Sequence, residues 1–204
     1  MRFSQTLFSL AALTSLTACI GLGSSVKPPQ YLFNLAASQH RPADAGQSVA
    51  AGKLISVTLP TQPRLLATSR IPVINAPNGV AYLPNTAWVD TPAPLFQRLI
   101  AETITAQNST VPLIIVALPA RQAGSTDGPR LGGELTMFGL DHATNEAVVI
   151  FDATLTGPTD VAVRSRRFEH RTPANLSKPQ LAAKAIEAAA NAVAAQVATW
   201  VAEN

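Results

Sequence analysis

The one cysteine of the chain, Cys19, closes a short apolar segment near the N-terminus and is the residue with the plainest chemistry. Arg2 supplies a positive start, and the run from Phe3 to Leu16 is apolar except for Ser, Thr and Gln. This layout is typical of a secretory signal whose apolar core is too short to span a bilayer. Leu16-Thr17-Ala18-Cys19 resembles a bacterial lipobox, in which the thiol is diacylated and cleavage leaves cysteine as the new N-terminus.

Two plainer interpretations of Cys19 are an ordinary signal peptide and a buried core cysteine of a cytosolic protein. We favour lipidation, because a lone thiol in an exported protein would otherwise be an unexplained reactive group. A buried methylene contributes about 0.8 kcal/mol and one acyl chain binds only marginally, so two or three chains would hold the protein on a membrane. Ile20, and not Asp, follows the cysteine. Sorting by that residue predicts the periplasmic face of the outer membrane.

The composition indicates a folded domain with a sizeable core. Hydrophobic residues make up 47% of the chain and charged residues 13%, which excludes a disordered protein. The net charge of +3 is too small to indicate a nucleic-acid partner. No later segment reaches the roughly 18 consecutive apolar residues that a membrane span needs. We therefore predict a signal peptide over residues 1–18, a lipidated tether over 19–30 and one domain over 31–204.

Strand patterns dominate the predicted domain. The connections at 141–145 and 157–160 are short, which favours an antiparallel meander of the three segments that they join. Asn78-Gly79 predicts a tight hairpin between two short β-rich runs. Alternation and β-rich runs predict strands over residues 31–35, 53–59, 71–75, 80–83, 111–118, 131–140, 146–156 and 161–171.

Two helices complete the predicted architecture. Asp90 or Thr91 can cap the first, which begins at Pro92 and continues at helical spacing to about residue 106. Ser177 is expected to cap the second, which runs to about residue 201 with Pro179 in its first turn. We expect a single α+β domain in which both helices pack on a mostly antiparallel sheet. In the second helix a polar stripe opposes an apolar face: Gln180, Lys184, Glu187 and Asn191 against Ile186, Val193, Val197, Trp200 and Val201.

The histidines and one loop serine give no catalytic or metal-binding pattern. His40, His142 and His170 lie far apart, and none has another His or a Cys at metal-ligand spacing. Ser125 and Asp127 share a Gly-rich loop, where turn chemistry accounts for them. We therefore expect no catalytic residue, metal or cofactor. A hydrolase would instead lose function when Ser125, Asp127 or His142 is replaced by alanine.

Three carboxylates lie in or beside the strands of the predicted meander. Asp141, Glu146 and Asp152 could approach one another. A catalytic pair would need a cleft and a raised pKa, which the sequence does not reveal. We expect these residues to have no enzymatic role.

A basic run and one tryptophan each allow two interpretations. Along a strand, Arg164 and Arg166 share one face with His170, and Arg167 and Arg171 share the other. We favour a solvated outer strand whose charge discourages edge pairing, and the alternative is a site for lipid phosphates or an acidic partner. Trp88 is expected to staple the first helix onto the sheet, and the alternative is a contact with a partner.

The ordered series of local motifs resembles the ABC-type transport auxiliary lipoprotein family, over nearly the whole mature chain. These small lipoproteins are associated with mammalian-cell-entry (MCE) type lipid transport systems, including a paraquat-inducible branch. The likeness rests on Tyr31-Leu32-Phe33, Ile55-Ser56-Val57-Thr58-Leu59-Pro60, Arg70-Ile71-Pro72-Val73, Val80-Ala81-Tyr82-Leu83 with Trp88-Val89-Asp90, Arg166-Arg167-Phe168 and the Ala-rich C-terminal helix.

The resemblance implies a non-catalytic role. An MCE substrate-binding protein and an ABC permease with its ATPase would move phospholipid or another apolar molecule, and the lipoprotein would dock the conduit at the outer membrane. A tether raises local concentration, so a weak protein contact becomes effective. A homo-oligomer is possible, and only Cys19 transfers from the family by motif. The alternative is an envelope scaffold that tethers an assembly without handling lipid.

Overall fold

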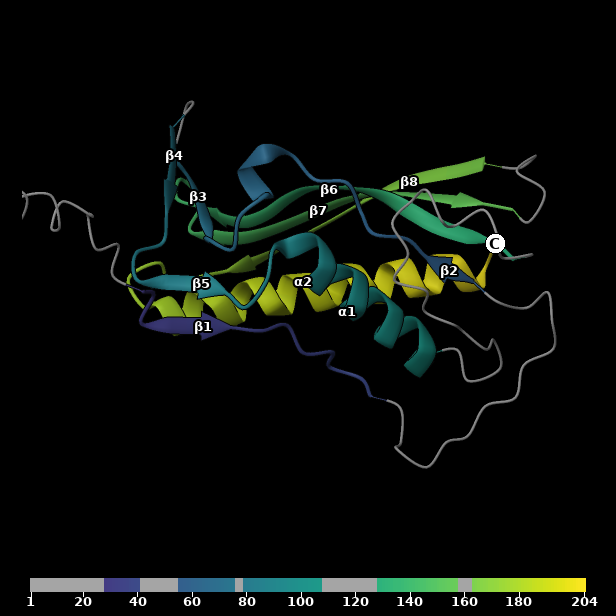
Figure 1. Cartoon of the computed structure of the whole chain (residues 1–204), viewed down its shortest axis with the longest axis horizontal. Helices are drawn as coiled ribbons and strands as arrows, with labels where there is room; N and C mark the ends of the chain where they lie inside the picture. The colour runs from purple at the N-terminus through teal and green to yellow at the C-terminus, as the bar shows by residue number, and fades with distance from the viewer. Residues whose placement is uncertain (1–27, 41–54, 76–78, 108–127, 158–162) are drawn as a thin grey trace, which may run out of the picture.

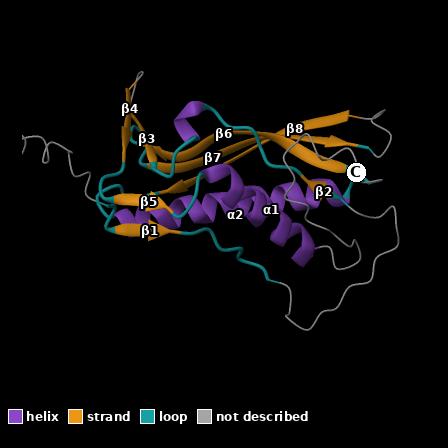
Figure 2. Cartoon of the chain, in the orientation of Figure 1, coloured by secondary structure: helices purple, strands orange, loops and turns teal. Residues whose placement is uncertain are grey.

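A mixed β-sheet and two helices make up most of the computed structural model, which describes residues 28–40, 55–75, 79–107, 128–157 and 163–204 (Figure 1). The expected α+β class is confirmed, and Figure 2 shows the helices together on one side of the sheet. The elements in chain order are β1 (Tyr31–Phe33), β2 (Ser56–Val57), the 3-10 turn η1 (Arg64–Leu66), β3 (Pro72–Asn75), β4 (Gly79–Tyr82), β5 (Thr86–Trp88), α1 (Pro92–Gln107), β6 (Arg130–Asp141), β7 (Glu146–Thr156), β8 (Val163–Pro173) and α2 (Pro179–Ala202).

The strands β6, β7 and β8 form an antiparallel meander in the larger sheet, as the short connections predict. The strand order is β4-β3-β6-β7-β8, with antiparallel pairing from β6 to β8 and in the β3–β4 hairpin. The sheet is nevertheless mixed, because β2 and β3 both pair in parallel with β6. A second, two-stranded parallel sheet joins β1 to β5. In the described part of the chain, β8 is an outer strand of the larger sheet.

A single segment of the chain, from β2 to β3, runs along one edge of β6. β2 pairs with its beginning, Thr61 bridges to Glu134 further along, and β3 pairs with its end at Leu140. Among the described residues 55–59 of the predicted strand over 53–59, only Ser56 and Val57 have ladder partners on β6, so the strand ends earlier than predicted. Residues 53 and 54 lie outside the described residues. Ser56 and Val57 are both buried, so the two faces of this short strand are covered.

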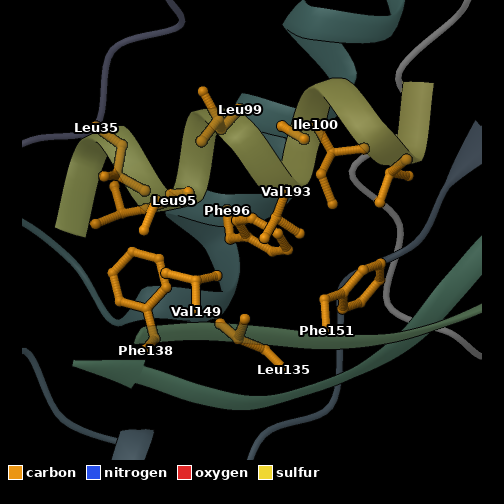
Figure 3. Packing of buried hydrophobic residues seen from close by; sticks show 14 of the residues in the cluster. Leu35, Leu95, Phe96, Leu99, Ile100, Leu135, Phe138, Val149, Phe151 and Val193 are labelled. Carbon is orange, nitrogen blue, oxygen red and sulfur yellow. The ribbon is translucent and has the colours of Figure 1, made fainter. Parts of the chain in front are cut away.

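The core lies between the helices and one face of the meander. Figure 3 shows α1 residues such as Phe96 and Ile100 above Phe138 and Phe151 of the sheet. The ring of Phe96 packs edge-on against both phenylalanines, with centroids 6.2 and 5.3 Å away. α2 contacts α1 as well as β6, β7 and β8, and its fully buried alanines allow close approach to the sheet.

Both helices have the boundaries that the sequence predicts. The residues that bond to their N-terminal ends differ from the predicted ones. The residue before α2 is Lys178, which makes no side-chain cap, so the prediction that Ser177 caps this helix is wrong. Asn175 Oδ1 instead accepts the Ser177 N–H at 3.1 Å, which forms a turn ahead of the helix. At α1, Gln62 Oε1 accepts the Ala93 N–H at 3.1 Å. Within the described residues, the Asp90 side chain accepts hydrogen bonds only from its neighbour Thr91.

The remaining predicted elements lie partly outside the described residues. The run 111–118, predicted as a central strand, is one of these, and so are residues 120–127 of the predicted loop. The hairpin around Asn78-Gly79 is confirmed by the antiparallel register of β3 and β4, although 76–78 themselves are not described.

Candidate functional site

The charged residues of the sheet gather on the face that α1 and α2 leave uncovered. β8 is exposed along most of its length, and Phe168 is its one fully buried residue. The Phe168 ring packs edge-on against Trp200 of α2. Because successive side chains of a strand point to opposite faces, Arg167 and Arg171 lie on the outer face, as the sequence predicts.

Arg167 forms a two-point ion pair with Asp152 of the neighbouring strand. Its Nε and Nη2 donate to the two carboxylate oxygens at 2.6 and 2.7 Å, and the two residues are directly opposite in the β7–β8 register. These hydrogen bonds hold the pKa of Asp152 below its usual value, against the opposing effect of partial desolvation. They also raise the pKa of the Arg167 guanidinium.

Arg171 gathers three carboxylates at the other end of β8. Its Nε donates to Glu169 at 2.7 Å, and its Nη1 lies 3.3 Å from Glu146 and 3.5 Å from Asp141. Burial raises the pKa of Asp141, but N–H groups of the following turn and Arg171 outweigh it and lower the pKa overall. The hydrogen bond to Glu169 is the main reason that the pKa of Arg171 is raised.

The three candidate carboxylates are therefore partners of arginines. Asp141 and Glu146 are brought together on Arg171, while Asp152 belongs to the separate pair with Arg167. A general acid needs a raised pKa, whereas the pKa values of Asp141 and Asp152 are both lowered. The geometry is that of a charge-paired outer sheet face.

Arg164 and Arg166 lie on the helix-facing side of β8 and differ from the other two arginines. Arg164 Nη1 donates to the main-chain oxygen of Asn204 at 3.1 Å. The Arg166 guanidinium lies 5.1 Å from the centroid of the Phe168 ring. Neither forms an ion pair with a carboxylate among the described residues.

The other predicted candidates are not assembled into a site. His40 follows β1, His142 lies in the β6–β7 turn and His170 in β8. Within the described ranges no group of three or more His, Cys, Asp or Glu is placed to hold a metal ion. Cys19, Ser125 and Asp127 lie outside the described residues.

Trp88 has the structural place that the sequence predicts. It is 1% exposed and packs edge-on against Phe33 and Phe138, with centroids 6.3 and 5.4 Å away. Phe138 also contacts Phe96 of α1. The rings of Trp88, Phe138 and Phe96 therefore connect β5, the meander and α1. The Trp88 indole Nε1 is buried and has no hydrogen-bond acceptor among the described residues.

The polar stripe of α2 has a role that the sequence analysis missed. Glu187 Oε1 accepts the Ala36 N–H at 3.0 Å, and Asn191 Oδ1 accepts the Ser38 N–H at 2.7 Å. Asn191 Nδ2 also donates to the Ala36 carbonyl at 3.0 Å. We call residues 34–38 the strap, because this extended segment is bound lengthwise to α2. In the sequence, the i, i+4 spacing of Glu187 and Asn191 is the one feature that could have indicated this contact with the strap. The same spacing is equally typical of a helix face exposed to solvent.

Comparison with known proteins identifies the family. The model of the ABC-type transport auxiliary lipoprotein component matches residues 33–198. The chain belongs to this family. It is thus a member of a family of auxiliary components of ABC-type transport, and no curated protein matches it.

Solved structures share the fold at low sequence identity. A crystal structure of an uncharacterized protein is 12% identical, with a TM-score of 0.66 over 84% of this chain and 98% of that one. Protein XCC0632 from Xanthomonas campestris, a DUF330 protein, is 18% identical, with a TM-score of 0.65 over 83% of this chain and 94% of its own. Neither α1 nor α2, the helices of the described part, is long and apolar enough to cross a membrane.

Proposed function

We propose that this family member is a non-catalytic, lipid-anchored accessory of an ABC transport system of the MCE type. In this proposal residues 1–18 are removed, Cys19 carries the acyl chains, residues 19–30 are the tether, and the domain of residues 31–204 faces the periplasm from the outer membrane. The transported molecule is phospholipid or another apolar substrate. Family membership over residues 33–198 is the observation that carries the proposal.

The attachment of the predicted tether to the domain supports this assignment. Asn85 holds the junction between the predicted tether and β1. Its carbonyl accepts the N–H groups of Gln30, the last tether residue, and of Tyr31, the first residue of β1, at 2.9 and 3.1 Å. The strap then fixes the following residues to α2. The end of the proposed tether is thus held against the folded domain at two successive points.

The charge pairing of the outer sheet face supports a role in binding. Asp141, Glu146 and Asp152 are each within 3.5 Å of an arginine nitrogen. A carboxylate whose pKa is lowered by such a partner is a poor proton donor near neutral pH. The same groups form a mixed-charge surface suited to a polar protein contact.

Affinity purification of the lipidated protein from gently solubilised envelopes tests the proposal. We expect mass spectrometry to identify an MCE protein and its permease among the co-purified proteins. Both should be absent from a parallel purification that uses an unrelated tagged lipoprotein. Recovery of a different assembly, or of no partner after cross-linking, would contradict the transport role. A different assembly would favour the alternative, an envelope scaffold that does not handle lipid.

A further inference from the structure

Of the two outer strands of the larger sheet, β8 has much the longer edge. It has 11 residues, against 4 in β4, and no other described segment pairs with its outer side. Proteins protect such edges by shortness, bulges, prolines or charge. β8 pairs with β7 without a register shift, and its one proline, Pro173, is its last residue. Of these four devices, β8 therefore has charge alone.

Half of the positive charge on β8 is not neutralised by carboxylates. The strand carries four arginines and one glutamate. Arg167 and Arg171 are both paired with acidic side chains of the sheet. In the described part of the chain, Arg164 and Arg166 form no ion pair with an Asp or Glu side chain. The unpaired positive charge is thus concentrated in the first half of the strand.

The two unpaired arginines lie on the same face of the sheet. They are two residues apart, which is about 7 Å along a strand, and both are exposed. The Arg166 guanidinium lies 5.1 Å from the centroid of the Phe168 ring, and Arg164 Nη1 donates to the main-chain oxygen of Asn204 at 3.1 Å. A guanidinium has five N–H donors, so both side chains keep donors for a ligand.

We propose that the outer edge of β8 pairs with an extended acidic segment of a partner protein. The segment adds a strand beside β8, and the main-chain hydrogen bonds of such an addition supply affinity. Residues directly opposite each other on neighbouring strands share a face, so acidic residues at alternate positions of the segment would face Arg164 and Arg166. The inference rests on the proposed accessory role and deepens it, because it names the kind of segment by which a partner would dock.

Two other occupants fit this edge less well. A second copy of the chain would bring a strand with the same excess of arginine, and like charges on neighbouring strands are destabilising. A membrane would have to approach the end of the domain that is far from the predicted tether. Arg164 contacts Asn204, and Figure 1 shows the C-terminus at the end of α2 opposite to β1. An acidic strand of a partner protein is complementary to β8 in both charge and shape.

Fluorescence anisotropy with a labelled synthetic peptide tests the proposal on the purified protein. In the probe, glutamate alternates with valine and threonine, and the comparison peptide has lysine in place of each glutamate. We expect saturable binding of the glutamate peptide and at least tenfold weaker binding of the lysine peptide. Hydrogen–deuterium exchange in β8 should slow when the glutamate peptide is added, because the outer main-chain N–H groups gain acceptors. No saturable binding, equal binding of the two peptides, or unchanged exchange in β8 would overturn the proposal.

Matched double substitutions test the two arginines. Arg164→Gln combined with Arg166→Gln should weaken binding of the glutamate peptide at least fivefold. The control combines Arg98→Gln with Lys184→Gln, which removes the same charge from exposed positions of α1 and α2 and should leave the affinity unchanged. Equal affinity of the two double variants would contradict the proposed contact.

Two further measurements test the other occupants. Displacement of the peptide by phosphatidylglycerol vesicles, but not by phosphatidylcholine vesicles, would assign the arginines to lipid phosphates. A lower sedimentation mass of the Arg164→Gln, Arg166→Gln variant than of the parent would assign the edge to a second copy. Either result would overturn the proposal. Recovery of the transport partners by affinity purification, together with no binding of the peptide, would overturn this inference and leave the transport role intact.

Discussion

Gly133 shows how a single residue is constrained by the strand opposite to it. Its φ of +145° lies in a region that L side chains rarely adopt, and a Cβ there would clash with the carbonyl oxygen of Asp152. Both problems involve backbone atoms, so no side-chain rearrangement relieves them. The glycine therefore permits the close β6–β7 contact in the middle of the meander.

Substitution of Gly133 by alanine should destabilise the domain by about 2 kcal/mol or more. Urea unfolding followed by circular dichroism measures the change. Gly79→Ala is the matched control: Gly79 is an exposed strand residue where the nearest atom to an added Cβ is 3.3 Å away. A loss in Gly133→Ala no larger than that in the control would contradict this assignment.

The ion pair of Asp152 with Arg167 predicts part of the acid sensitivity of the protein. The folded-state pKa of Asp152 is lowered, chiefly by its hydrogen bonds from Arg167. The associated stability is therefore present above the unfolded-state pKa of about 3.9 and is lost as the pH falls through the folded-state value. Asp152→Asn should show a smaller fall in the urea midpoint between about pH 5 and pH 2 than the parent protein does.

A second carboxylate substitution controls for the general effect of charge. Glu203 is exposed and forms no ion pair in the described part of the chain. We expect Glu203→Gln to retain the parent pH dependence. An Asp152→Asn variant whose midpoint falls as steeply as that of Glu203→Gln would show that the pair with Arg167 contributes nothing to acid stability.

At the scale of elements, α2 joins three parts of the fold. Its apolar face covers the meander and α1, and its polar stripe binds the strap. Leu35 and Ala37 of the strap are buried. The hydrogen bonds that Glu187 and Asn191 accept from the strap N–H groups hold these two apolar side chains against the core. The strap therefore covers the part of the polar stripe at Glu187 and Asn191, while Gln180 and Lys184 of the same stripe stay exposed.

Asn191→Ala should release the strap without unfolding the domain. The Ser38 N–H loses its acceptor and the Ala36 carbonyl loses its donor, so amide exchange at Ser38 should accelerate by at least tenfold. Hydrogen–deuterium exchange with peptide resolution measures this. Gln196→Ala, at an exposed position of the same helix, should leave the exchange of Ser38 unchanged. Equal protection in the two variants would contradict the role of Asn191.

Elements differ in how far the sequence predicts them. The meander is predictable because its strands are long, alternate regularly and are joined by short turns. The lengths of β2 and β1 are not predictable, because only the parallel neighbours β6 and β5 decide which of their residues pair. The same holds for the α1 cap from Gln62, which lies 31 residues before Ala93.

At the scale of the whole molecule, β1 and the C-terminus lie at opposite ends of α2. Figure 1 shows β1 at one end of α2 and the C-terminus at the other. A tether of the length predicted here reaches on the order of 30 Å when extended, at about 3.1 Å per residue. The proposed lipid anchor would therefore keep the β1 end nearer to the membrane surface.

Cys19→Ala should abolish membrane attachment and leave the domain folded. The substitution removes the proposed acylation site, which lies outside the described residues, and each lost methylene contact weakens membrane binding by about 0.8 kcal/mol. Fractionation of envelopes after high-salt washing measures the loss, and thermal unfolding of the released protein measures the fold. A variant that stays with the membrane after such washing would contradict the anchor.

The sequence alone determined the class of the fold, the meander, both helices and the likeness to the auxiliary lipoprotein family. These depend on local periodicity and turn chemistry, which a sequence carries directly. Only the tertiary structure decided that Asp141, Glu146 and Asp152 are paired with arginines, that Glu187 and Asn191 bind the strap, and that the buried Trp88 N–H has no acceptor among the described residues. Each of these depends on residues far apart in the chain that are brought within hydrogen-bonding distance, or kept beyond it, only when the layers pack.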